Sequence, residues 1–154
     1  MTSSSPVDAA IDLTLETALA ILNAARGEAR ARRLNPLAVC ILDARGAVKC
    51  TIAEDGTSLK RSEIARAKAE GALALGVGSR ALLGHARDLP LFMNAATLVL
   101  GGALIPAPGG VLIRARDGRL LGVVGISGDS SDNDEACAIA GISAVGLKAD
   151  PGEE

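Results

Sequence analysis

The stretch Gly118–Ala140, GRLLGVVGISGDSSDNDEACAIA, predicts a buried strand, a tight loop and the start of a helix. Its first half, from Leu120 to Ile126, is apolar and uncharged, which is typical of a strand. The segment Ser127–Ser131 that follows has the Gly, Ser and Asp residues of a turn. We expect Asp132 to cap the next helix and Glu135, three residues later, to complete a capping box.

The loop at the centre of this stretch is a candidate ligand site. A strand that leads into a helix N-terminus points backbone N–H groups at one spot, which favours an anion. The same loop carries acidic residues that repel an anion unless caps or ion pairs engage them: Asp129, Asp132, Asp134 and Glu135. The sequence therefore leaves the sign of the ligand's charge open.

Two other interpretations of this loop are disfavoured. The string Gly125–Asp129, GISGD, displaces the second glycine of a GxSxG nucleophile elbow, and the chain has a single histidine far from it. The acidic run DSSDNDE lacks the glycine of an EF-hand loop. We therefore predict neither a serine triad nor a metal site.

The rest of the chain predicts helices that alternate with pairs of strands. The expected elements are a helix of about 20 residues after Thr14, strands at Leu37–Leu42 and Ala47–Ala53, a helix capped by Thr57 or Ser58, short helices near Ser79–His85 and Leu89–Leu100, and a strand at Val111–Ile113. Because adjacent strands are joined by short turns, we expect an α+β fold with a central antiparallel sheet. We predict a disordered tail at residues 1–11, one domain at residues 12–148 and a frayed tail at residues 149–154.

Composition limits the classes of partner. The formal net charge is −2 and aromatic residues make up 1%, so we expect no nucleic-acid partner. No signal peptide or membrane span is predicted, and we expect a cytoplasmic protein with no membrane partner. The three cysteines show no CxxC spacing and are expected to be reduced, although Cys40 and Cys50 fall on adjacent strands. A core built from Ala and Gly buries little area, which favours a homo-oligomer.

Lys68 lies on or near the apolar stripe of its predicted helix. Its ammonium group either snorkels outward or enters a pocket and meets a carboxylate, for which Glu135 is the candidate. Such a pair either anchors the fold or holds a substrate carboxylate and transfers a proton. His85, the only histidine, is the candidate acid or base that titrates near neutral pH, although a lone loop histidine is more often a surface residue.

The segments DGTSLKRSEIARAKAEGALALG and PAPGGVLIRARDGRLLGVVGISGDSSDNDEACAIAGI resemble the GlcG/HbpS-type haem-binding-like family, which includes the C-terminal domain of PduO-type proteins. The resemblance extends over about Leu13–Ile142. The matching positions are Asp55, Gly56, Ser62, Ile64, Ala65, Lys68, Ala69, Pro108, Gly109, Gly110, Gly122, Gly125, Ser127, Gly128, Asp134, Glu135 and Ala136.

The resemblance implies a profilin-like fold of about five strands with helices on both faces, and assembly into oligomers such as octamers. It implies three alternatives for the function. The protein is an enzyme that catalyses hydrolysis of, or proton transfer on, a small carboxylated catabolic intermediate; a protein that binds or senses haem; or an oligomeric accessory protein of a catabolic operon. Haem would need His85 or Met93 as iron ligand and Arg61, Lys68 or Arg114 at its propionates; the first function requires no cofactor. The predicted site residues are Lys68, Glu135 and His85 for catalysis and Arg61, Ser62, Pro108, Gly109, Gly110, Ser127, Gly128 and Asp134 for ligand binding.

Overall fold

The computed structural model describes residues 13–153. The disordered tail expected at residues 1–11 lies outside the described residues. In chain order, the elements are α1 (Leu15–Ala31), β1 (Ala38–Asp43), β2 (Val48–Ala53), α2 (Arg61–Leu75), α3 (Ser79–Asp88), α4 (Pro90–Val99), β3 (Gly110–Arg114), β4 (Leu120–Ser127), α5 (Ser131–Ala144) and β5 (Lys148–Asp150).

The five strands form one antiparallel sheet in the order β2-β1-β4-β3-β5. The strand predicted from Leu120 to Ile126 is the central one, because β4 pairs with β1 on one side and with β3 on the other. Val124 thus lies between Ile41 and Val111. The predicted α+β fold with a central antiparallel sheet is confirmed.

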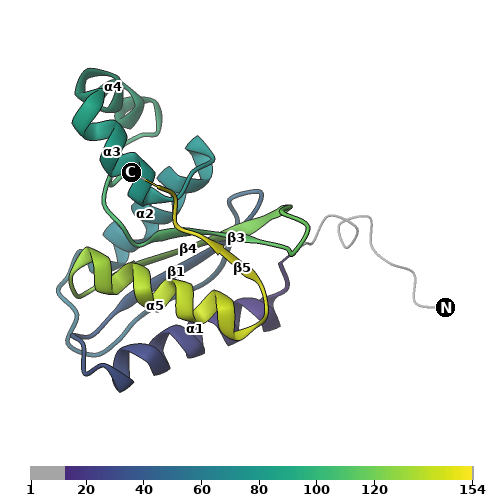
Figure 1. The fold of residues 1–154 in the computed structure, drawn as a ribbon. Coiled ribbons are helices and arrows are strands. Elements are labelled where there is room, and N and C mark those ends of the chain that lie inside the picture. Colours follow the sequence, from purple (N-terminus) through teal and green to yellow (C-terminus); the bar gives the residue numbers. More distant parts are fainter. Residues whose placement is uncertain (1–12, 154) are drawn as a thin grey trace.

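Helices cover both faces of this sheet (Figure 1). Helices α1 and α5 pack together on one face and α2 packs on the other, against β1 and β4. The approach of α2 to β4 is very close: a Cβ atom added at Gly125 would collide with the backbone oxygen of Ala65. A glycine at this position in β4 is therefore required by packing rather than by a turn.

Helices α3 and α4 extend beyond α2, away from the sheet (Figure 1). They share a small apolar cluster of Leu82, Met93, Ala96 and Leu104. The two short helices predicted in this region are confirmed, with α3 three residues longer than expected.

Two predicted helix starts are wrong. Ser130, not Asp132, caps α5: its side chain accepts a hydrogen bond from the backbone N–H of Asn133. The expected capping box is absent because Asp132 and Glu135 both bind an arginine instead. Helix α2 begins at Arg61, after Lys60, and neither Thr57 nor Ser58 caps it.

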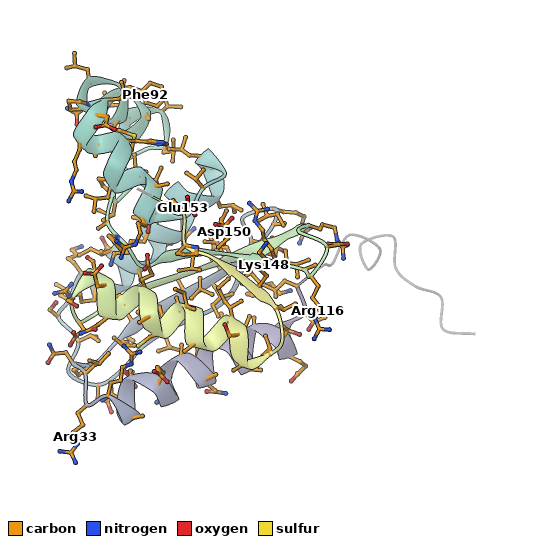
Figure 2. All side chains as sticks on the ribbon, in the orientation of Figure 1. Arg33, Phe92, Arg116, Lys148, Asp150 and Glu153 are labelled. Carbon is orange, nitrogen blue, oxygen red and sulfur yellow. The ribbon has the colours of Figure 1, made fainter. Side chains whose placement is uncertain are left out.

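The prediction of a frayed tail at residues 149–154 is also wrong for the part that the structure describes, which ends at residue 153. Lys148–Asp150 forms β5 at the edge of the sheet, paired with β3. Gly146, at φ 76°, reverses the chain after α5 and so allows this pairing. Arg114 Nε then donates to Asp150 Oδ2 at 2.8 Å, and the carbonyl of Pro151 accepts from the backbone N–H of Arg80. Figure 2 shows Lys148 and Asp150 along this last strand.

Cys40 and Cys50 lie on adjacent strands, as predicted, but on opposite faces of the sheet. Cys40 lies in the cluster under α2, whereas Cys50 packs against the cluster under α1 and α5. All three cysteines are free. In the described residues, no helix is both long and apolar enough to span a membrane.

Candidate functional site

Lys68 points into the protein from the middle of α2 and is only 3% exposed. Its Nζ donates to Asp134 Oδ2 at 3.2 Å and to the carbonyl of Ile126 at 3.0 Å. Of the two expectations for this lysine, the outward position is wrong and the inward one is confirmed. The expected partner is wrong: the carboxylate is that of Asp134, one residue before Glu135.

Burial governs the electrostatics of this pair. It lowers the pKa of Lys68, against the attraction of Asp134, and it raises the pKa of Asp134, against the attraction of Lys68. The second oxygen of Asp134 accepts from the backbone N–H of Asp129 at 2.9 Å. The pair thus ties α2 to the end of β4 and to the start of α5.

The turn Pro108–Gly110 closes over Lys68. A Cβ atom on Gly109 would lie 2.9 Å from Lys68 Nζ, and one on Gly110 would collide with the carbonyl oxygen of Lys68. The N–H of Gly110 donates to Ser79 Oγ at 2.7 Å. The structure therefore brings Pro108, Gly109 and Gly110 to Lys68. All three residues are buried, and none of them lines a pocket that the structure shows.

Glu135 binds Arg80, at the start of α3. Both of its oxygens accept from Arg80, the shortest contact being 3.0 Å between Nε and Oε2, and Asp132 binds the same guanidinium. These hydrogen bonds, from Glu135 first and then Asp132, raise the pKa of Arg80. Sequence analysis missed Arg80, since nothing in the local pattern of α3 distinguishes it from an ordinary surface arginine.

His85 is exposed in the last turn of α3. None of the hydrogen bonds of the Lys68 and Glu135 clusters includes it. The structure therefore does not assemble Lys68, Glu135 and His85 into one site: the first is buried with Asp134, the second is paired with Arg80, and the third faces solvent.

Arg61, the first residue of α2, lines an open pocket of about 200 Å³. Its Nη1 donates to the buried Oγ of Ser127 at 3.1 Å, which fixes the guanidinium at the end of β4. The other lining residues are Asn35, Pro36, Gly56, Thr57, Ser58 and Gly128. We call this the Arg61 pocket. It unites three predicted ligand-binding residues: Arg61 and Gly128 line it, and Ser127 holds Arg61.

Arg61 differs from most arginines of the described residues in its lack of an acidic partner. The arginines with a carboxylate within ion-pair distance include Arg26, Arg30, Arg32, Arg45, Arg66, Arg80 and Arg114. Within residues 13–153, no ion pair is found for Arg61, although its side chain is partly buried. A partly buried cation that faces a pocket without a counter-charge attracts an anion.

Three of the four acidic residues of the loop are paired with cations: Asp134 with Lys68, and Asp132 and Glu135 with Arg80. The fourth, Asp129, keeps its negative charge and is held in place by hydrogen bonds. Asp129 accepts from Asn133 Nδ2 at 2.7 Å and from the backbone N–H groups of Asn35 and Ser130. These bonds, that of Asn133 first, lower the pKa of Asp129. The positive charge that faces the Arg61 pocket is that of Arg61, whereas the Lys68 ammonium is buried in its pair with Asp134.

Ser62 does not join this pocket. It lines a separate hollow of about 230 Å³ over the edge of the sheet, with Cys40, Val48, Thr51, Glu63 and Arg66. Across residues 13–153 there is no cluster of three or more His, Cys, Asp or Glu side chains arranged to hold a metal ion.

The five-stranded antiparallel sheet with helices on both faces defines a small α+β domain of the profilin-like type. A family model described as "Haem degrading protein HbpS-like" matches residues 13–143. The chain therefore belongs to the HbpS-like family, and the predicted GlcG/HbpS-type resemblance is confirmed.

Solved structures agree with this assignment. The chain is 27% identical to the protein in "Crystal Structure of PduOC:Heme Complex", with a TM-score of 0.79 over 92% of this chain and 99% of that one. It is 25% identical to HbpS, with a TM-score of 0.74 over 94% of each chain. Klebsiella pneumoniae ORFY shares the fold, at 19% identity and a TM-score of 0.79 over 87% of this chain and 90% of that one. No curated protein sequence matches the chain.

Proposed function

We propose that this protein binds a small carboxylated molecule in the Arg61 pocket. The observation that supports the proposal most is the Arg61 guanidinium itself, which is partly buried, fixed by Ser127 and without an ion-pair partner in residues 13–153. An arginine presents two parallel N–H groups that match the two oxygens of a carboxylate. A carboxylate bound here replaces the missing counter-charge.

The rest of the Arg61 pocket suits a small polar ligand. Thr57 and Ser58 bring hydroxyl groups, and Gly128 lets the chain approach a ligand without a side chain in the way. A volume of about 200 Å³ is below the range of drug-sized ligands, so the ligand is a short metabolite. The chemical class is therefore a small mono- or dicarboxylate.

The proposal concerns binding rather than turnover. The side chains that line the Arg61 pocket include no carboxyl, imidazole or thiol group that could move a proton at neutral pH. The contacts of Lys68 and Glu135 favour structural roles for both. Hydrolysis or proton transfer by Lys68, Glu135 and His85 stays a hypothesis from the sequence.

Isothermal titration calorimetry with acetate, lactate and succinate tests the proposal, at constant pH and ionic strength. We expect at least one of the three to bind, and Arg61→Gln to weaken it by about tenfold or more, since a charge-assisted hydrogen bond contributes about 1.5–3 kcal/mol. Arg116→Gln, in the turn between β3 and β4, is the control and should bind like the wild type. Equal affinity in Arg61→Gln, or no binding of any of the three, contradicts the proposal.

Haem is the second candidate ligand, because the related PduOC structure is a haem complex. The iron needs a His, Met, Cys or Tyr ligand. In the described residues Met93, Cys40 and Cys137 are buried, and His85 is exposed. The candidate iron ligands are therefore His85 and the half-buried Cys50, whereas Arg114, predicted at a propionate, is paired with Asp150. Haemin titration checks haem binding: a Soret band that disappears in His85→Ala supports haem at His85, and no band in the wild type excludes it.

A further inference from the structure

A second hollow, of about 330 Å³, lies beside the Arg61 pocket. Its lining residues are Arg26, Arg30, Pro36, Ala53, Glu54 and Asp55, and we call it the Arg26 hollow. Pro36 lines both the hollow and the pocket, and the chain runs from Asp55 in the one directly to Gly56 in the other. Gly56 has no side chain, and a Cβ atom there would lie 3.4 Å from Pro36 Cγ. Pro36 and this turn therefore form the boundary between the two cavities.

Two arginines of α1 share one carboxylate in the Arg26 hollow. Arg26 Nε donates to Glu54 Oε2 at 3.2 Å, and Arg30 Nη2 donates to Glu54 Oε1 at 3.1 Å. The backbone N–H of Leu37 donates to the same Oε1 at 2.8 Å. Glu54 carries a single negative charge, which compensates only one of the two guanidinium groups. The arginine side chains are 46% and 49% exposed, so their remaining N–H groups are accessible to a ligand in the hollow.

Arg30 also connects the Arg26 hollow to the Arg61 pocket. Its Nη2 donates to the backbone carbonyl of Asn35 at 3.3 Å, and Asn35 lines the pocket. The surplus positive charge of the arginine pair therefore lies within one residue of the pocket. Asp55 is the acidic group that opposes this charge, but its side chain is exposed, where water and salt screen it.

We propose that the ligand of the Arg61 pocket is a dicarboxylate, whose second carboxylate extends past Pro36 to Arg26 and Arg30. This inference rests on the proposed function, since the first carboxylate is the one that Arg61 binds. The second carboxylate supplies the counter-charge that Glu54 alone does not give to two guanidinium groups, and it accepts charge-assisted hydrogen bonds from them. An ammonium group at that end would face two cations, so an amino acid fits less well.

Matched pairs of ligands test this inference by isothermal titration calorimetry at constant pH and ionic strength. Succinate, glutarate and adipate are compared with butyrate, pentanoate and hexanoate, so that each pair has the same chain length and differs in the second carboxylate. We expect at least one dicarboxylate to bind about fivefold or more tightly than its partner, as one additional, partly exposed ion pair provides. This exceeds the roughly twofold advantage of two equivalent ends. 4-Aminobutyrate, which is positive at its second end, should bind less tightly than succinate.

Arg26→Gln should abolish the preference for the dicarboxylate and leave the affinity for its monocarboxylate partner unchanged. The variant keeps the wall of the hollow in place, because Arg30 still holds Glu54. Arg32→Gln is the matched control, since it makes the same change in net charge at the end of α1 and Arg32 lines neither cavity. It should bind both members of the pair like the wild type.

Equal affinities within every pair overturn the inference, and if this binding still depends on Arg61, the proposed function stands without it. Tighter binding of 4-aminobutyrate than of succinate also overturns it. An Arg26→Gln protein that keeps the preference, or that loses affinity equally for both members of the pair, shows that Arg26 does not bind the second carboxylate. Absence of binding for all six carboxylates overturns both this inference and the proposed function.

Discussion

Lys68 and Asp134 form a buried ion pair, with 3.2 Å between Nζ and Oδ2 and side chains that are 3% and 1% exposed. The pair lies beneath the Pro108–Gly110 turn and directly behind the end of β4, where Ser127 holds Arg61. We interpret it as the anchor that places Ser127 and the following loop at the Arg61 pocket. On this interpretation Lys68 and Asp134 have a structural role, whereas Arg61, a few residues before Lys68, binds the ligand.

Breaking the pair should destabilise the protein strongly. Asp134→Asn leaves the Lys68 ammonium buried without a full counter-charge, so we expect a loss of about 3–5 kcal/mol in the free energy of unfolding. Lys60→Met, which breaks the exposed pair with Glu63, should cost less than about 1 kcal/mol. Urea denaturation measures both, and an Asp134→Asn protein as stable as the wild type would show that the pair is not an anchor.

Gly125 should not tolerate a methyl group. Its Cβ atom would collide with the carbonyl of Ala65, so Gly125→Ala should separate α2 from β4 and cost about 1–3 kcal/mol of stability. Gly27, in the middle of α1, has open space instead, with no atom within 4 Å of the point where a Cβ atom would lie. Gly27→Ala should therefore stabilise the protein by up to about 1 kcal/mol. Thermal unfolding of the two variants should show shifts of opposite sign.

Arg80 should hold α3 against the start of α5. Arg80→Gln removes the contacts to both Glu135 and Asp132, and we expect faster amide hydrogen exchange in residues 79–88 than in the wild type. Arg66→Gln, which breaks an exposed pair within α2, serves as the control and should leave exchange in α3 unchanged. If the amide hydrogens of α3 exchange at the same rate in Arg80→Gln as in the wild type, this role is refuted.

Acid should destabilise the loop through Asp129. Hydrogen bonds from Asn133 and from two backbone N–H groups lower its pKa in the folded protein. A carboxyl group with a lowered pKa stabilises the fold above its unfolded pKa of about 3.9, and this contribution is lost as the pH falls through the folded value. Stability should be measured at intervals of about one pH unit from pH 5 downwards. Over this range Asp129→Asn should lose less stability than the wild type. Parallel stability curves for the two proteins would contradict this assignment.

Much of the fold was predictable because its signals are local. The uncharged run from Leu120 to Ile126 predicted β4, and Thr14 caps α1, the helix expected to follow it. The tail was missed because β5 is only three residues long and its pairing with β3 is a tertiary contact.

The site was predictable only in part. Ser127 and Gly128 were identified as positions that match the family and Arg61 as a candidate propionate partner, and the structure unites them. The partner of Lys68 was misassigned because Asp134 and Glu135 are neighbours on a helix, where a shift of one residue turns a side chain by about 100°. Capping favoured Glu135, whereas burial selects Asp134. No sequence rule pairs Arg80 with Glu135, which lies 55 residues away.

The central claim is that Arg61 binds a carboxylate in its pocket, and an NMR titration of the amide groups tests it most directly. On addition of succinate at constant pH and ionic strength, the amide signals of Thr57, Ser58 and Gly128 should shift and saturate together in the wild type, and should stay unchanged in Arg61→Gln. Shifts of equal size in Arg61→Gln, or no saturable shift at these three residues in the wild type for succinate, lactate and acetate alike, would contradict the account.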